Sequence, residues 1–173
     1  MRIGFISTRL AGTDGVSLET AKWATVLNGM GHEIFYCAGE LDRDSPPGNL
    51  LPEMHFHDIK NKEISKHAFG YDIKLKSEED KNRIICELKR KIERYVTKLR
   101  KEIKKFIIKY NINLIICENI LAIPMHIPLG IAVTELIKET NVPTIAHHHD
   151  FYWERKRFLK NYVQDILDNY FPP

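Results

Sequence analysis

The segment richest in reactive side chains is TIAHHHDFYWER, Thr144 to Arg155, in which three histidines and an aspartate follow a short apolar run. Successive side chains of a β-strand point to opposite faces, so His147 and His149 share one face and His148 takes the other. The three histidines therefore cannot all bind one ion. Three interpretations remain: a histidine that orients or deprotonates a hydroxyl, a solvated strand end, and a metal site made by His147 with His149 or Asp150. The sequence shows no third ligand at metal-binding spacing.

A second candidate is the glycine-bearing loop GTDGVSLE, Gly12–Glu19, between an expected strand and an expected helix. Glycines there let backbone amides approach an anion, and a helix N-terminus adds partial positive charge. The spacing matches neither GxGxxG nor GxxxxGK[ST], so the dinucleotide-binding and P-loop fingerprints are absent. The alternative is an ordinary tight turn between strand and helix.

Three aromatic residues and an arginine, FYWER, follow the histidines at Phe151–Arg155. Aromatic faces pack well on apolar ring surfaces, so they are candidates to line a sugar or acceptor pocket, or else to dock the last helix. Arg155 is a candidate to clamp a carboxylate or phosphate, with pairing to Glu154 or another neighbour as the alternative.

Apolar runs and helical spacing predict the elements that must position these residues. Strands are expected at residues 2–7, 32–38, 53–59, 113–119 and 142–148, and helices from Val16 to a stop at Gly29–Gly31, at 77–110, at 127–140 and at 154–170. Residues 39–76 are otherwise expected to be irregular. Alternating strands and helices predict an α/β, Rossmann-like parallel sheet with helices on both faces.

In such sheets ligands bind beyond the carboxyl ends of the strands. This rule places Arg9–Val16, Cys117–Asn119 and His147–Asp150 on one rim. The sequence therefore predicts that the candidate residues of three separate segments meet at one edge of the sheet.

Composition limits the class of protein. A chain of 173 residues with 43% hydrophobic content is expected to form one domain, residues 1–173. A net charge of +3 is too small to indicate nucleic-acid binding. Three separated cysteines without a CxxC pair support neither a zinc knuckle nor a disulfide framework, and they favour a reducing compartment. Prolines interrupt the longest apolar region, Ile120–Val133, so it is not a membrane span, and a cytoplasmic protein is expected.

The expected long helix is strongly basic. Residues 78–110 contain twelve Lys or Arg and six Asp or Glu, a net +6, which leaves −3 for the rest of the chain. A basic amphipathic helix can lie on an anionic membrane, so peripheral membrane contact through residues 78–110 is one interpretation. The preferred one is that its apolar stripe packs on the sheet while the charges are solvated.

Two stretches carry a family resemblance. RIGFISTRLAGTDGVSLETAKWATVLNGMGHEI resembles the opening of the N-terminal domain of family-4 glycosyltransferases, which are retaining enzymes of the two-Rossmann-domain GT-B type. NLIICENILAIPMHIPLGIAVTELIKETNVPTIAHHHDFYWER resembles that family's stretch from the strand after the long helix to a His-Asp pair at the end of a later strand. The likeness covers residues 1–38 and 112–158, and residues 39–110 match only in general layout.

The resemblance implies that this chain is one half of a GT-B architecture. It would supply the acceptor side of a site that transfers a sugar from a nucleotide-sugar donor to a hydroxyl acceptor, with no cofactor and no obligatory metal. The implied catalytic residues are His149 and Asp150. The implied substrate-binding residues are Gly12, Thr13, Asp14, Gly15, Glu118, Asn119 and Arg155.

The family places most donor binding in a second Rossmann domain with an E-x7-E glutamate pair, and residues 1–173 contain no such domain. The resemblance therefore implies a chain truncated at its C-terminal end and inactive alone. Its missing C-terminal domain would be supplied in cis or as a separate subunit, because catalysis needs both walls of the cleft. The alternative function is a free-standing, non-catalytic Rossmann-like module that binds a ligand or a partner.

Overall fold

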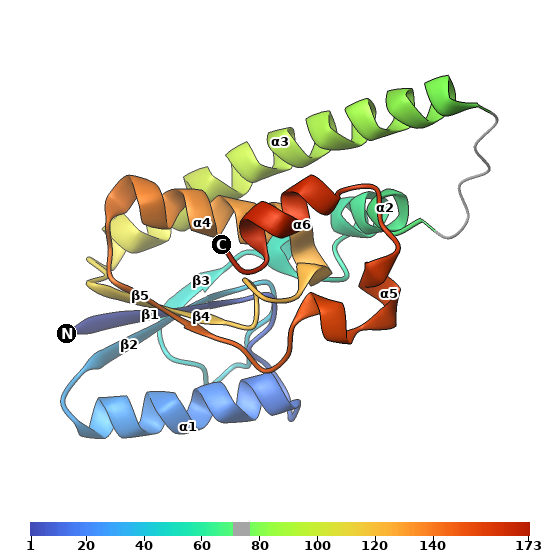
Figure 1. Cartoon of the computed structure of the whole chain (residues 1–173). Helices are drawn as coiled ribbons and strands as arrows, with labels where there is room; N and C mark the ends of the chain where they lie inside the picture. Colours follow the sequence, from blue (N-terminus) through green and yellow to red (C-terminus); the bar gives the residue numbers. More distant parts are fainter. Residues whose placement is uncertain (71–76) are drawn as a thin grey trace.

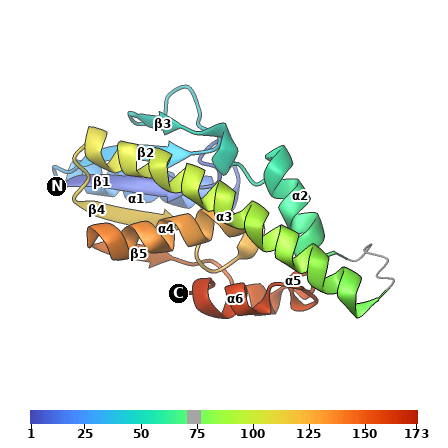
Figure 2. The same ribbon diagram turned by 90° about the horizontal axis from the view of Figure 1, so that it is seen from above.

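The computed structural model describes residues 1–70 and 77–173. The last six positions of the stretch expected to be irregular, residues 71–76, lie outside the described residues. A five-stranded parallel sheet in the order β3-β2-β1-β4-β5 forms the centre of the molecule (Figures 1 and 2). The strands are β1 (Arg2–Ser7), β2 (Glu33–Ala38), β3 (Gly48–Leu50), β4 (Leu114–Glu118) and β5 (Thr144–His147).

Helices cover both faces of this sheet, which confirms the predicted fold class (Figure 1). The α-helices are α1 (Gly15–Gly29), α2 (Ile59–Ala68), α3 (Glu78–Lys109), α4 (Ile127–Thr140), α5 (Lys156–Leu159) and α6 (Gln164–Tyr170), and three 3-10 turns are η1 (Pro52–Met54), η2 (Pro124–His126) and η3 (Tyr152–Glu154). In the view of Figure 1, α1 lies below the sheet, and α3 and α4 lie above it. The predicted helices at 77–110 and 127–140 are confirmed to within a residue.

Strand β1 separates two apolar layers. Ile3 and Phe5 belong to the cluster under α1, whereas Ile6 belongs to the cluster that α3 and α4 form with the other face. Gly4 shares that second face, and a Cβ there would lie only 2.9 Å from the Phe106 ring. The absence of a side chain at Gly4 therefore lets α3 pack close to the middle of the sheet.

The stretch before α2 differs from the prediction. The strand expected at 53–59 is wrong: Pro52–Met54 forms a 3-10 turn and Ile59 begins α2. Proline favours the first turn of a helix and Asp58 caps α2, so these residues favour helical turns over the alternating pattern between them. Gly48–Leu50, expected to be a loop, pairs in parallel with β2.

The last helix also differs. The continuous helix expected at 154–170 is wrong, because the chain forms the short α5, Lys156–Leu159, and then α6, Gln164–Tyr170. Between them the backbone N–H of Tyr162 donates to the carbonyl of Ala68 at 2.8 Å. This tertiary hydrogen bond draws the chain toward the end of α2, at the point where a continuous helix would have passed.

Several basic residues of α3 pair with acidic residues of neighbouring elements. Arg100 lies 2.8 Å from Glu135 of α4, and Lys98 lies 2.6 Å from Glu53 of η1. The apolar stripe of α3 is buried at Leu88, Ile92, Tyr95, Val96, Leu99, Ile103, Phe106 and Ile107. These contacts support the interpretation of a helix packed on the sheet, and membrane contact stays a prediction. Among the described residues, no helix combines the length and apolarity that a membrane crossing needs.

Four helices begin at a side chain that accepts hydrogen bonds from first-turn amides: Asp14 for α1, Asp58 for α2, Ser77 for α3 and His126 for α4. The start of α3 after Ser77 agrees with the helix expected from residue 77. Such caps satisfy amides that have no partner within the helix, so they fix where each helix starts.

Replacing Asp14 by alanine removes the cap of α1, and we expect the free energy of unfolding to fall by about 1 kcal/mol. Asp14→Asn keeps an oxygen that accepts from Val16 and Ser17, so it should lose less. Urea denaturation measures both. Equal losses in the two variants would show that the carboxylate charge, which lies 3.6 Å from Arg9, matters rather than the cap.

The buried histidine His126 should make the free energy of unfolding depend on pH in the acid range. Its Nδ1 accepts from the Leu129 amide at 3.2 Å and its Nε2 lies 2.9 Å from the Glu53 carbonyl, and burial lowers its pKa to about 4. The unfolded side chain titrates near pH 6.5, so as the pH falls from 6.5 to 4 the unfolded state gains a proton that the folded state does not. We expect this group to lower the free energy of unfolding by up to about 1.4 kcal/mol per pH unit in that window.

The variant His126→Asn keeps a capping oxygen and removes the titrating group. The difference in unfolding free energy between the wild type and this variant should therefore shrink as the pH falls from 7 to 4, as measured by urea denaturation at several pH values. Parallel pH profiles would contradict the assignment.

Candidate active site

The order of the strands places a crevice between β1 and β4. From β1 the chain proceeds outward through β2 to β3, then returns to place β4 on the other side of β1. Such a switch point is where open α/β sheets bind ligands. A cavity of about 210 Å³ opens there, and its lining includes Ser7, Thr8 and Arg9 after β1, Glu118 and Asn119 at the end of β4, and Asp14 before α1.

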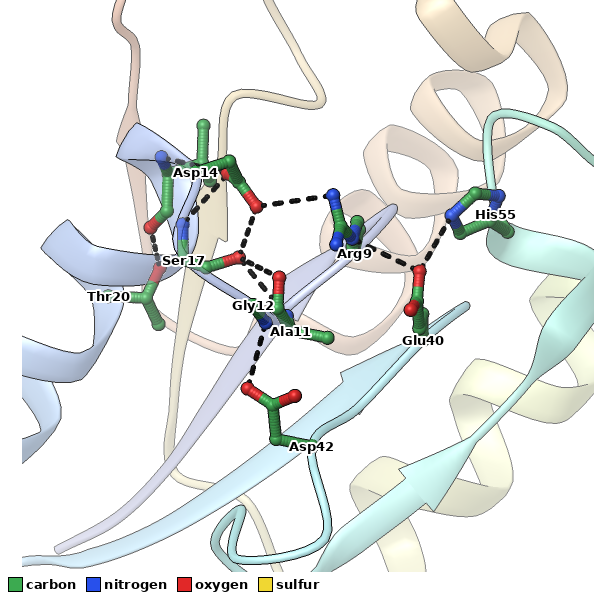
Figure 3. Close-up of polar contacts among 10 residues, drawn as sticks. Arg9, Ala11, Gly12, Asp14, Ser17, Thr20, Glu40, Asp42 and His55 are labelled. Atoms are coloured by element: carbon green, nitrogen blue, oxygen red, sulfur yellow. Dashed lines mark hydrogen bonds and ion pairs between the residues drawn. The ribbon is translucent and has the colours of Figure 1, made fainter.

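Arg9 is held by two carboxylates beside this cavity (Figure 3). Its Nη1 lies 3.6 Å from Asp14 Oδ2, and its Nε lies 3.0 Å from Glu40 Oε2. The same Glu40 oxygen lies 3.2 Å from Nε2 of His55. Partial burial tends to raise the pKa of the Asp14 carboxyl, but its hydrogen bonds with Ser17 and the charge of Arg9 outweigh this and hold the pKa below its usual value. Asp14 is therefore an anion at the mouth of the cavity.

Acidic side chains also engage amides of the glycine loop (Figure 3). Gly12 adopts a left-handed conformation with φ of 73°, which glycine adopts without strain, and its N–H donates to Asp42 at 2.9 Å. The amides of Val16 and Ser17 donate to Asp14. The sequence predicted that amides of this loop would bind an anionic ligand. Three of them, those of Gly12, Val16 and Ser17, instead donate to carboxylates of this chain.

Glu118 lies at the end of β4 with its side chain fully buried, and two histidines face it. Its Oε2 is 2.9 Å from Nδ1 of His147 and 3.7 Å from Nε2 of His149. Burial raises the pKa of the Glu118 carboxyl, and the charges and hydrogen bonds of the two histidines offset only part of that effect. The ring of Trp23 from α1 stacks on His147 with centroids 4.8 Å apart.

Asn119 fixes the two histidines relative to β4 through its backbone amide and its side-chain oxygen. Its N–H donates to the His147 carbonyl at 2.9 Å, and its Oδ1 accepts from the His149 amide at 3.3 Å. Asn119 has a φ of 58°, a left-handed conformation that asparagine tolerates better than most residues. As predicted, His148 lies away from this group, and its ring contacts Phe151.

The remaining predicted residues form a separate contact. Asp150 and Arg155 make a short ion pair with each other, and neither lines the cavity. The rings of Phe151 and Trp153 stack with centroids 4.7 Å apart, and about half of the Trp153 side chain is exposed. The partner of Arg155 is thus Asp150 rather than Glu154, which accepts from the Phe151 amide.

The structure therefore brings together part of the predicted set. Asp14, Glu118 and Asn119 line one cavity, and His149 contacts both Glu118 and Asn119. Gly12, Thr13 and Gly15 form the loop, but among the described residues none of these three lines the cavity. The sequence placed Arg9 on the rim as the first residue of the Arg9–Val16 segment but did not single it out as a site residue. Its position two residues after the first strand was the available signal.

Comparison with known proteins gives two relatives. The chain is 30% identical over 177 residues to the mannosylglucosylglycerate synthase of Petrotoga mobilis, and 33% identical over 175 residues to the protein of the same name from Thermotoga maritima. Both matches cover all of this chain, which spans 38% of the length of each relative. Neither a protein-family model nor a solved structure matches the sequence.

Proposed function

We propose that this chain forms the acceptor side of a retaining, family-4-like glycosyltransferase of the GT-B type. The observation that carries the proposal is the similarity of the whole chain to two proteins named mannosylglucosylglycerate synthase. An enzyme that joins a mannosyl unit to glucosylglycerate is a glycosyltransferase. The proposed substrates are accordingly a nucleoside-diphosphate mannose as donor and a glucosylglycerate-like hydroxyl compound as acceptor.

The chemistry consists of one exchange of bonds at the sugar. The acceptor hydroxyl oxygen forms a bond to the anomeric carbon, and the bond from that carbon to the donor diphosphate breaks. The nucleoside diphosphate leaves with the electron pair, and the hydroxyl proton passes to an oxygen of the leaving group or to a base of the site. Electrostatic stabilisation and exact placement of the two substrates supply most of the rate enhancement in such a reaction.

The proposed roles follow from the positions of the side chains. About a third of the His149 side chain is exposed, so its imidazole can bind the reacting hydroxyl while Asn119 holds its backbone. Asp14 and Asn119 supply oxygen and amide groups for sugar hydroxyls at the cavity. Arg9 supplies a guanidinium, the group best suited to pair with the carboxylate of a glycerate unit.

The cavity is also small for a complete site. Its volume of about 210 Å³ lies below the range of roughly 300–1,000 Å³ typical of pockets that enclose a ligand. The 38% coverage of both relatives leaves room for a second, donor-binding domain in the whole protein. We therefore propose that a second wall, in the same polypeptide or in a separate subunit, completes the cleft.

The mass of the protein in its own cells tests whether a second domain of the same polypeptide completes the cleft. An immunoblot with an antibody to residues 1–173 should show a band about 2.6 times the 20.2 kDa of this chain, the inverse of the 38% coverage. A band at 20.2 kDa would contradict a second domain in cis. The proposal would then require a separate subunit, to be sought by copurification.

Substitution of His149 tests its proposed role in sugar transfer. In the protein at its natural length, we expect His149→Ala to lower mannosyl transfer from a nucleoside-diphosphate mannose to glucosylglycerate by at least about 100-fold, the range that loss of a positioned acid or base gives. Product formation is measured by mass spectrometry. His148→Ala is the matched control and should keep near-normal turnover, because its ring contacts Phe151, whereas His147 and His149 are the histidines that pair with Glu118.

Both variants should give the circular dichroism spectrum of the wild type. Near-normal turnover of His149→Ala would remove this residue from the mechanism. Failure of the wild type to transfer mannose from any nucleoside-diphosphate mannose would overturn the proposed reaction and favour a non-catalytic binding module.

A further inference from the structure

We propose that Glu118, His147 and His149 form a binding site for a divalent transition-metal ion of the Zn²⁺ class. The three residues offer one carboxylate oxygen and two imidazole nitrogens that all lie within 4.8 Å of one another. Two histidines and one glutamate are a ligand set that zinc takes in proteins, with a fourth position left open. The proposal goes beyond the transferase function and does not rest on it.

The distances among the ligand atoms fit a small tetrahedral ion. Bonds of 2.0–2.1 Å place two ligands of a tetrahedral zinc about 3.3 Å apart. In this structure Glu118 Oε2 lies 2.9 Å from Nδ1 of His147 and 3.7 Å from Nε2 of His149, on either side of that value. The nitrogens of His147 and His149 lie within 4.8 Å of each other, so the imidazole rings must rotate toward one another to place all three atoms around one ion.

The carboxylate of Glu118 is a second, independent sign of a ligand. Its side chain is fully buried, and within the described part of the chain its Oε1 has no hydrogen-bond partner. A buried carboxylate with one unpaired oxygen is costly, because burial removes its hydration without replacing it. A cation bound at Oε2 would compensate the charge of this carboxylate, and a water on that cation could donate to Oε1.

The backbone holds the three ligands in place before any ion binds. Glu118 and His147 are paired across β4 and β5, and the two hydrogen bonds of Asn119 fix the backbones of His147 and His149. The Trp23 ring stacks on His147 and limits its rotation. About a quarter of the His147 side chain and a third of that of His149 are exposed, which provides a path for an ion and for a fourth ligand.

The alternative third ligand considered from the sequence, Asp150, is engaged elsewhere. Its carboxylate forms the ion pair with Arg155. The group that completes the set is Glu118, which lies 29 positions before His147 in the chain. The parallel pairing of β4 with β5 brings it to the two histidines, so no spacing within TIAHHHD could have indicated it.

Zinc binding is tested with the tag-free protein at its natural length, treated with EDTA and titrated with ZnCl₂ by isothermal calorimetry. We expect one ion that is lost in Glu118→Gln and in His147→Ala, with affinities lower by about 100-fold or more, since even outer-shell changes cost 10- to 100-fold. The matched controls are His148→Ala and Asp150→Asn, which should bind as the wild type does. Because the readout is binding, a protein that binds zinc but transfers no sugar would leave this proposal intact.

Cobalt(II) distinguishes this site from a cysteine site, because Cys86 is an exposed thiol. Ligation by two imidazoles and a carboxylate should give visible d–d bands without thiolate charge-transfer absorption. Thiolate absorption, equal weakening in the His148→Ala control, or no zinc binding by the folded wild type would each overturn the proposal. His149→Ala provides a further check, should Glu118→Gln fail to fold.

Discussion

The rim of this sheet depends on one buried carboxylate, that of Glu118. Removing a carboxylate from water costs several kcal/mol unless a partner compensates it. Here the partner is His147, which the register of β4 and β5 places directly opposite Glu118. A shift of β5 by one residue would turn His147 to the other face of the sheet and leave the carboxylate alone. The cost of burying the Glu118 carboxylate without a partner thus favours the observed register of β5, and with it the position of His149.

Helix α1 connects this carboxylate to the rest of the candidate site. Its N-cap, Asp14, lines the cavity and interacts with Arg9, and its Trp23 stacks on His147. Because the cap fixes where α1 begins, it also fixes the position along the helix axis at which Trp23 stacks on His147. The glycine loop is therefore positioned by carboxylates of the chain itself. This arrangement gives the amides of the loop a structural role, and in the proposed site a ligand is contacted by the side chain of Asp14 and by side chains at the strand ends.

Much of this arrangement could be predicted from the sequence, because local patterns encode it. The apolar runs predicted the main strands, helical spacing predicted the start of α3 near residue 77, and the parallel order placed Glu118, Asn119 and His149 on one rim. The prediction was wrong or incomplete where contacts between residues far apart in the sequence determine the structure. The break before α6 follows from the hydrogen bond of Tyr162 to Ala68, and the pairing of Glu118 with His147 follows from strand register. Neither contact has a signature within its own segment.

The two uses proposed for His149 make competing demands on one imidazole. Its Nε2 faces Glu118 at 3.7 Å, the same nitrogen that a metal ion on Glu118 and His147 would take. A ring bound in this way can offer only Nδ1 to a sugar hydroxyl, and as a metal ligand it can no longer accept a proton at Nε2. In a metal-free site Nδ1 can face the acceptor hydroxyl while Nε2 faces Glu118, whose carboxylate can stabilise a protonated ring. Metal binding and the proposed sugar transfer through His149 therefore oppose each other, so an ion at this rim would inhibit the proposed reaction rather than serve as its cofactor.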